Sequence, residues 1–171
     1  DGNKEVNATE VFTLTDSVEY KHLVPGKEYV LKGVLMNKAT GKTLEVDGKE
    51  ITSEVKFTPE QPSGTVDVLF TFDSKFIKTE TQIVAFEYLY KDGKEIATHT
   101  DIEDEGQTVT VKIPSIKTTA KINGKKKVVA KGDVTITDTV SYENLTPGKE
   151  YEITGVLMDK STGKPFKVKG K

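Results

Sequence analysis

The sequence predicts an all-β fold, an immunoglobulin-like β-sandwich, from three observations. Apolar and polar residues alternate with a period of two along short segments, turn residues separate these segments, and no segment has convincing helical spacing. The alternation is clearest where Val66, Val68, Phe70 and Phe72 share one face of an extended segment. Several short strands at this spacing are typical of a β-sandwich.

The other expected strands are rich in β-branched and aromatic residues. In chain order they span 11–20, 28–36, 82–91, 95–100 and 107–113. The connections between them contain the Gly and Pro that hairpins and tight turns need. These turns lie at 24–27, 39–42 and 91–94. The segment 111–116 then predicts a short join to a further β-unit.

Composition excludes several classes of function. The chain has 171 residues and a net charge of −2, which leaves no electrostatic footprint for nucleic acid or an anionic membrane. No run of 18 apolar residues is present to span a bilayer. The absence of Cys excludes disulfides and zinc–thiolate sites, and His22 and His99 are too few for a histidine-rich metal site. We therefore expect no cofactor and no metal.

The chain repeats itself at an offset of 122 residues. Residues 1–49 align with 123–171 without a gap, and 26 of these 49 positions are identical. We expect tandem β-sandwich domains, with 1–113 as one copy that lacks its first strand. Residues 114–171 are then the amino-terminal part of the next copy, and the chain is a piece of a larger protein.

Five polar residues share a face with the apolar residues of their expected strands. They are Asp16, Glu87, His99, Gln107 and Thr118, and Asp138 repeats Asp16 in the second copy. Singly, each has an ordinary explanation: a Thr can fill a core, an Asp can cap a bulge, and Glu87 or Gln107 can face solvent on an edge strand. Because unpartnered polar groups are costly to bury, their number favours a polar network inside the core.

Such a network has the parts for an internal acyl transfer. A Thr hydroxyl is a nucleophile, His is a general base, and a protonated buried carboxyl can polarise a Gln amide, which would give a side-chain ester and ammonia. Asp16 and Glu87 would share one proton, because a low-dielectric core cannot hold both charges. A Lys–Asn isopeptide bond is the alternative, but the expected last strand, 107–113, contains no Asn.

Four short sequence motifs indicate a family. They are Val84-Ala85-Phe86-Glu87, Ala97-Thr98-His99-Thr100-Asp101, Gln107-Thr108-Val109 and Thr118-Thr119-Ala120. The chain resembles, over its whole length, the VaFE-repeat ester-bond domains of Gram-positive surface adhesins. That resemblance implies Cna-B-type immunoglobulin-like sandwiches that stand in tandem as a stalk, extracellular and anchored to the cell wall.

The resemblance also implies a Thr–Gln ester between the first and last strands of each domain. Carried over by position, the cross-linking residues are Gln107 and Thr118, with Thr119 as the alternative to Thr118. Asp16, Glu87 and His99 would assist in the first copy, and Asp138 in the second.

The match is incomplete in one respect. By the offset, the reactive Thr of the first copy would precede Asp1, while the second copy has no Glu, His or Gln partner within the sequence. Thr118 of one molecule is therefore expected to fill the first-strand position of another, head to tail. Closure within one chain is harder, because parallel strands need a longer connection than the ten residues between Gln107 and Thr118.

The resulting expectation is a structural stalk module that reacts once with itself and is not an enzyme. Its expected partners are neighbouring copies of the same domain, and the host ligand stays open. The alternative is a host-ligand-binding module without this chemistry. The acidic stretch Asp101, Glu103, Asp104 and Glu105 lacks the spacing of a calcium loop and is interpreted as a solvated turn.

Overall fold

A computed structural model describes residues 4–7, 11–129 and 132–167. The strands are β1 (Glu5–Asn7), β2 (Val11–Tyr20), β3 (Tyr29–Asn37), β4 (Lys42–Thr43), β5 (Glu45–Val46), β6 (Lys49–Glu50), β7 (Thr52–Phe57), β8 (Gly64–Asp73), β9 (Thr81–Lys91), β10 (Lys94–His99), β11 (Thr108–Lys112), β12 (Ser115–Ile122), β13 (Ile136–Glu143), β14 (Met158–Asp159) and β15 (Lys164–Pro165). The only helical segment in these ranges is the 3₁₀ turn η1 (Ser74–Phe76). The described residues contain no helix with the length and apolar character to span a bilayer.

The all-β expectation is confirmed, and each expected strand is present with ends shifted by at most three residues. β7 is a strand that the pattern did not predict. Its residues Thr52–Phe57 alternate between exposed and half-buried positions and pair with β3. A polar edge strand of this kind carries too weak an apolar row to stand out in the sequence.

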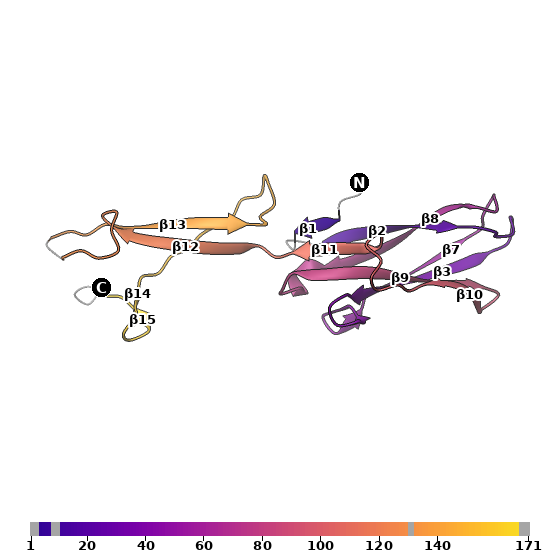
Figure 1. Cartoon of the computed structure of the whole chain (residues 1–171), viewed down its shortest axis with the longest axis horizontal. Helices are drawn as coiled ribbons and strands as arrows, with labels where there is room; N and C mark the ends of the chain where they lie inside the picture. The colour runs from indigo at the N-terminus through magenta and orange to yellow at the C-terminus, as the bar shows by residue number, and fades with distance from the viewer. Residues whose placement is uncertain (1–3, 8–10, 130–131, 168–171) are drawn as a thin grey trace.

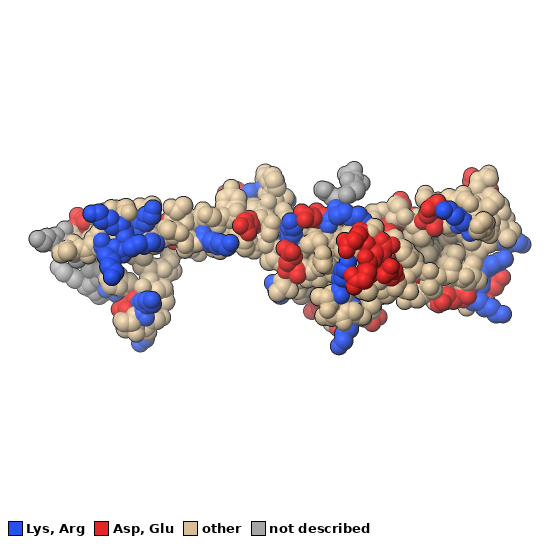
Figure 2. Space-filling model, in the orientation of Figure 1, with Lys and Arg blue, Asp and Glu red and all other residues tan. Residues whose placement is uncertain are grey.

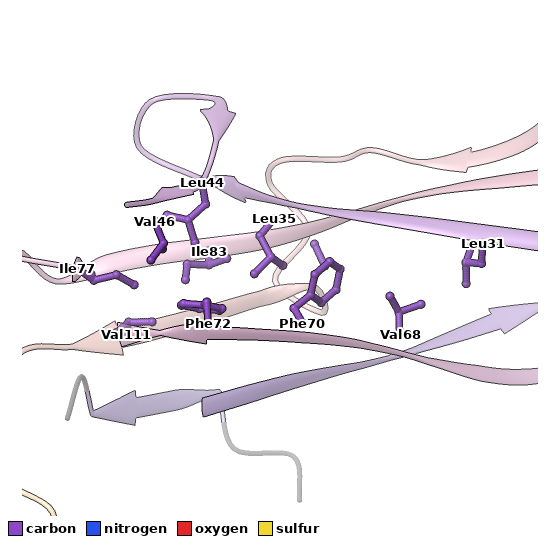
Figure 3. Packing of buried hydrophobic residues seen from close by; sticks show 11 residues of the cluster. Leu31, Leu35, Leu44, Val46, Val68, Phe70, Phe72, Ile77, Ile83 and Val111 are labelled. Atoms are coloured by element: carbon purple, nitrogen blue, oxygen red, sulfur yellow. The ribbon is translucent and has the colours of Figure 1, made fainter. Parts of the chain in front are cut away.

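The first part of the chain is a two-layered sandwich (Figure 1). One sheet has the order β1-β11-β9-β3-β4, with β10 beside the second half of β9 and β7 beside β3. The facing sheet is the antiparallel pair β2–β8. Leu31, Leu35, Val68, Phe70 and Ile83 pack between the layers, as Figure 3 shows.

A glycine on β3 makes room for the largest of these core side chains. A Cβ atom on Gly33 would lie 2.4 Å from the ring atom Cζ of Phe70, so the ring occupies the space above the glycine. Gly33 is also the register partner of Glu87 on β9. This close packing therefore lies beside one of the candidate site residues.

The second part of the chain repeats local structure of the first part. β14 pairs with β15 as Met158↔Pro165 and Asp159↔Lys164, the register that β3 and β4 have at Met36↔Thr43 and Asn37↔Lys42. The exposure of its side chains differs, however. Leu157 is 53% exposed, whereas Leu35, 122 residues earlier, is fully buried. Within the described residues, the second part has local structure without a core of its own.

β12 follows β11 directly and leads away from the sandwich (Figure 1). It forms a hairpin with β13, with antiparallel pairing from Ser115↔Glu143 to Ile122↔Ile136. By the 122-residue offset, β13 corresponds to residues 14–21, which are most of β2. Among the described strands β2 pairs only with β8, whereas β13 pairs with β12, a strand that has no counterpart beside β2.

Candidate functional site

Two carboxyl groups meet inside the sandwich, one from each sheet. Asp16 lies at the centre of β2 opposite Val68, and only 9% of it is exposed. Glu87 lies on β9 between Gly33 of β3 and His99 of β10, and is 2% exposed. The period-two pattern placed both residues on the inward face, and their burial agrees with it.

The buried pair holds a proton at neutral pH. Among the described residues, no donor reaches Oδ2 of Asp16 or either carboxyl oxygen of Glu87. Burial, and next the hydrogen bond and charge of Asp16, raise the pKa of Glu87 to about 9, with a smaller contribution from Asp104. The proton on Glu87 then supplies the donor that these oxygens lack, and the group is an acid inside an apolar core.

His99 lies beside this acid at the end of β10. Its Nδ1 is 3.9 Å from Oε2 of Glu87, and its Nε2 is 3.0 Å from Oδ2 of Asp104. The side chain is 45% exposed, so the expectation of a fully inward His99 is wrong. β10 pairs only with β9 among the described strands, and an edge strand leaves one flank of its residues open to solvent.

Gln107 lies one residue before β11 and is half-buried. Its carbonyl oxygen accepts a hydrogen bond from the backbone N–H of Ala85 at 3.3 Å, and its N–H donates to the carbonyl of Asp104 at 3.2 Å. Ala85 precedes Glu87 by two residues and shares its face of β9. The backbone of Gln107 is therefore anchored beside the strand that carries the buried acid.

A cavity of about 170 Å³ opens between the end of β2 and β10. Val18 and Tyr20 line it from β2, Glu87 and Leu89 from β9, and His99 from β10. The site thus combines an acid, an imidazole and a hollow next to the unpaired edge of β2. No group of three or more Asp, Glu or His side chains in the described ranges is placed to hold a metal ion.

The sequence of this chain matches a known protein family. The family model of the T-Q ester bond containing domain matches residues 1–111 and 114–171. The chain belongs to this family. The family takes its name from an ester bond between a Thr and a Gln, and no curated protein sequence shows significant similarity to the chain.

The fold of this ester bond domain is also found in a solved structure. A bacterial adhesin from Mobiluncus mulieris, containing intramolecular disulfide, isopeptide and ester bond cross-links, was solved in two crystal forms. The P1 form aligns with a TM-score of 0.55 and 13% identity over 82% of this chain and 71% of that chain. The P21 form gives 0.56 and 14% over 84% and 72%. At this identity the likeness concerns the fold.

Two of the predicted site residues of the ester bond domain lie apart from the cavity. Thr118 on β12 pairs with Val140, and Asp138 on β13 pairs with Ala120; all but the half-buried Val140 are exposed. The expectation that Thr118 and Asp138 face an interior is wrong here, because β12 and β13 have no second sheet packed against them in the described chain. Their roles, and the choice between Thr118 and Thr119, stay predictions.

Asp104 also lies beside His99, and the sequence pattern did not predict this position. It belongs to the acidic loop between β10 and β11, which forms the red patch at the middle of the sandwich in Figure 2. The sequence pattern favoured a solvated turn, yet Asp104 contacts His99 and is only 30% exposed. In the sequence, only its position between His99 and Gln107 indicated that Asp104 could lie near the site.

Proposed function

We propose that the chain is a structural module of a bacterial surface adhesin, cross-linked by an ester that the module forms on itself. The observation that carries this proposal is that protonated Glu87 and His99 line one cavity beside an unpaired strand edge, while the backbone of Gln107 is anchored to β9 two residues before Glu87. Each group would act once, so the chemistry has no turnover.

The reaction would join a Thr hydroxyl to the side chain of Gln107. His99 takes the hydroxyl proton as Oγ attacks Cδ of Gln107, and the proton on Glu87 stabilises the negative charge that develops on the amide oxygen. The C–N bond then breaks, the nitrogen receives a proton from His99, and ammonia leaves. The product is lighter than the reactants by one ammonia and keeps every other atom.

The β12–β13 hairpin supplies a template for the strand that brings the Thr. Thr118 lies opposite Val140, and Val140 corresponds to Val18 by the 122-residue offset. A strand paired with β2 in the same register places its Thr opposite Val18. Val18 lines the cavity together with Glu87 and His99, so this register brings the hydroxyl to the reactive groups.

We propose β12 of a second molecule as the strand that fills this edge. Within one molecule β12 leads away from the sandwich, and ten residues separate Gln107 from Thr118. Thr118 of one chain would therefore react with Gln107 of another, and the assembly would grow head to tail. Asp138 would accompany Thr118 as the residue paired with Ala120, two positions along β12.

The cross-link would suit a stalk on the cell wall of a Gram-positive bacterium. A covalent bond between first and last strands lies on the path of a force that pulls on both ends of a domain. It also removes loop-closure entropy from the unfolded chain, as a disulfide does, without Cys or an oxidant. Tandem copies of one domain, 1–113 and the beginning of another in 114–171, fit a spacer better than a ligand site.

The intact mass of the denatured chain and a denaturing gel test this proposal. We expect covalent multimers that are lighter by one ammonia for each junction. Thr118→Ala and Gln107→Ala should both abolish them, whereas Thr119→Ala is the matched control that should leave them intact. Multimers that survive Thr118→Ala but not Thr119→Ala would transfer the role to the neighbouring residue.

A second chain separates the chemistry from the assembly. It carries an added amino-terminal copy of residues 114–122, which restores the first strand in cis. We expect this chain to be a monomer lighter by one ammonia. An unmodified mass in both chains, under conditions where both are folded, would exclude the ester as their function.

A further inference from the structure

The turn after β12 contains the only Asn-Gly pair in the sequence. Asn123 and Gly124 lie between Ile122 and Lys125, whose backbones exchange two hydrogen bonds at 2.7 and 2.9 Å. Both turn residues have a positive φ, 48° and 76°, as a type I′ turn requires. Both are exposed, and a Cβ atom on Gly124 would have no neighbour within 4 Å. The backbone nitrogen that follows Asn123 is therefore not shielded by a side chain.

Two other asparagine side chains are held by hydrogen bonds. Oδ1 of Asn37 accepts from the N–H groups of Ala39 and Thr40 at 3.0 and 3.3 Å. Nδ2 of Asn144 donates to the carbonyl of Ile113 at 3.0 Å. Within the described residues, the side chain of Asn123 makes no hydrogen bond. Its carboxamide is thus the one of these three that no partner fixes.

We propose that Asn123 is a self-modifying residue, which deamidates to aspartate and isoaspartate through a cyclic imide with Gly124. The backbone nitrogen of Gly124 attacks Cγ of Asn123, the bond from Cγ to Nδ2 breaks, and ammonia leaves with the proton of the Gly124 amide. Water then opens the imide. Its addition at Cγ gives aspartate, whereas its addition at the backbone carbonyl carbon of Asn123 leaves the main chain running through Cγ and gives isoaspartate.

The fold controls how fast the ring closes. The imide ring contains the Cα–C bond of Asn123 and needs Cβ and the next nitrogen nearly eclipsed, whereas a left-handed backbone with ψ about +47° keeps them far from eclipsed. The turn must therefore open first. In the described chain the β12–β13 hairpin has no second sheet packed against it, and local opening of such a region costs little free energy. The second part of the chain thus delays the reaction only weakly.

The two products differ in their effect on the turn. Asp47-Gly48 and Asp92-Gly93 form turns with the same pair of positive φ values. In the first copy, Asp1-Gly2 is aligned with the Asn-Gly pair. Aspartate therefore suits this turn and adds one negative charge next to the lysines at 125–127. Isoaspartate adds a methylene to the main chain, so it disrupts the two-residue turn at the end of β12.

Incubation of the full chain in water enriched in oxygen-18 tests the proposal, because deamidation places a labelled oxygen on the modified residue. Peptide mapping by mass spectrometry locates the label, and electron-transfer fragmentation distinguishes isoaspartate from aspartate. We expect label at Asn123, and none above background at Asn37 and Asn144, which are internal controls in the same sample. Absence of label at Asn123, or equal labelling of the three residues, overturns the proposal.

Asn123→Asp is the matched variant, since it carries the charge of the product from the start and cannot release ammonia from this residue. In ordinary water we expect the mass of the parent chain to increase as the amide becomes an acid, and the mass of the variant to stay constant. An equal increase in both chains would assign the change to another residue and contradict the proposal.

Hydroxylamine separates this reaction from ester formation, which also releases ammonia. It cleaves the chain at the imide into residues 1–123 and 124–171, whereas cleavage of an ester between Thr118 and Gln107 returns full-length monomers. We expect the two fragments from the parent chain and their loss in Asn123→Asp, whether or not any ester forms. A parent chain that gives no fragments overturns the proposal even if ester-linked multimers are present.

Discussion

Glu87 is a carboxylic acid whose surroundings favour its neutral form. It is almost completely buried, its nearest charged neighbour Asp16 is another acid, and no donor in the described chain reaches its oxygens. A protein gains nothing in packing from such a residue, since an apolar side chain of similar size fills the same space at lower cost. The position is better explained by the proton that the side chain carries.

The pH dependence of stability follows from this proton. Folded Glu87 keeps its proton up to about pH 9, whereas the unfolded chain loses it near its ordinary pKa of 4.5. Between these values the folded state binds the extra proton, so raising the pH favours unfolding, by at most about 1.4 kcal/mol per pH unit. Denaturant unfolding at several pH values measures the slope.

Glu87→Gln removes the titrating group and keeps the shape of the side chain. We expect this variant to lose the downward slope between pH 5 and 9, and Glu54→Gln on exposed β7 to keep it. A slope that survives Glu87→Gln would mean that another group binds the proton.

At the residue scale, the sequence pattern predicts which way a side chain faces in a strand but not in a loop. Asp16 and Glu87 could be predicted as inward because alternate residues of a strand share a face. Asp104 could not, because a loop has no such period, and an acidic run gives no sign of which member turns inward. His99 was predicted on the inward face of its strand, but its side chain is 45% exposed because β10 is an edge strand.

At the scale of elements, the packing of β8 against β3 depends on a residue with no side chain. Gly33 lies under the ring of Phe70 and beside Glu87 in the register. The ring thereby contacts the backbone of β3 closely and fills the core next to the site. A side chain at position 33 would displace that ring.

Gly33→Ala should therefore destabilise the sandwich, by about 1–3 kcal/mol, the usual cost of overpacking a core. Gly155→Ala is a matched control, since Gly155 aligns with Gly33 but has no atom within 4 Å of an added Cβ. Denaturant unfolding compares the two. Phe70→Leu in the Gly33→Ala background should recover part of the loss, and equal effects of the two Ala substitutions would contradict the packing argument.

The arrangement of the elements was less predictable than the elements themselves. The parallel pairing of β1 with β11, Glu5↔Thr110 to Asn7↔Lys112, joins segments about a hundred residues apart. No local pattern records such a pairing, and only the family resemblance implied parallel first and last strands. The sequence pattern also did not predict that β2 pairs with one described strand only, β8, while β13 pairs with β12.

At the scale of the whole molecule, two aligned segments of similar sequence differ in structure: one is packed in the sandwich and the other is exposed. Residues 29–36 lie in β3 and bury Tyr29, Leu31 and Leu35, whereas the aligned 151–158 include large apolar side chains that are exposed, with Leu157 in place of buried Leu35. The difference lies in β9, which pairs with β3, and in β8, which lies in the facing sheet, because neither strand has a counterpart in the described second part. Tertiary contacts, rather than local preference, decide the outcome.

Hydrogen exchange should reveal this difference within a single sample. Amides of 31–35 are held in β3, whereas 153–157 form no described strand, so we expect the first set to exchange about 10³-fold more slowly or more. Mass spectrometry of peptides from both segments measures the ratio. Comparable protection of the two segments would mean that the second part finds packing partners of its own, for example in another copy.

The connection between the two parts has a consequence for the length of any array built from it. The side-chain amide of Asn144 donates to the carbonyl of Ile113 at 3.0 Å, which ties the loop after β13 to the residue before Pro114. An array with freely rotating joints would grow in reach as the square root of the number of its units, whereas stiff joints make the reach proportional to that number. At the aligned position 22 the residue is His, which lacks this amide donor. Joints with Asn at this position would thus be stiffer than joints with His, and an array with more of them would reach further for the same number of units.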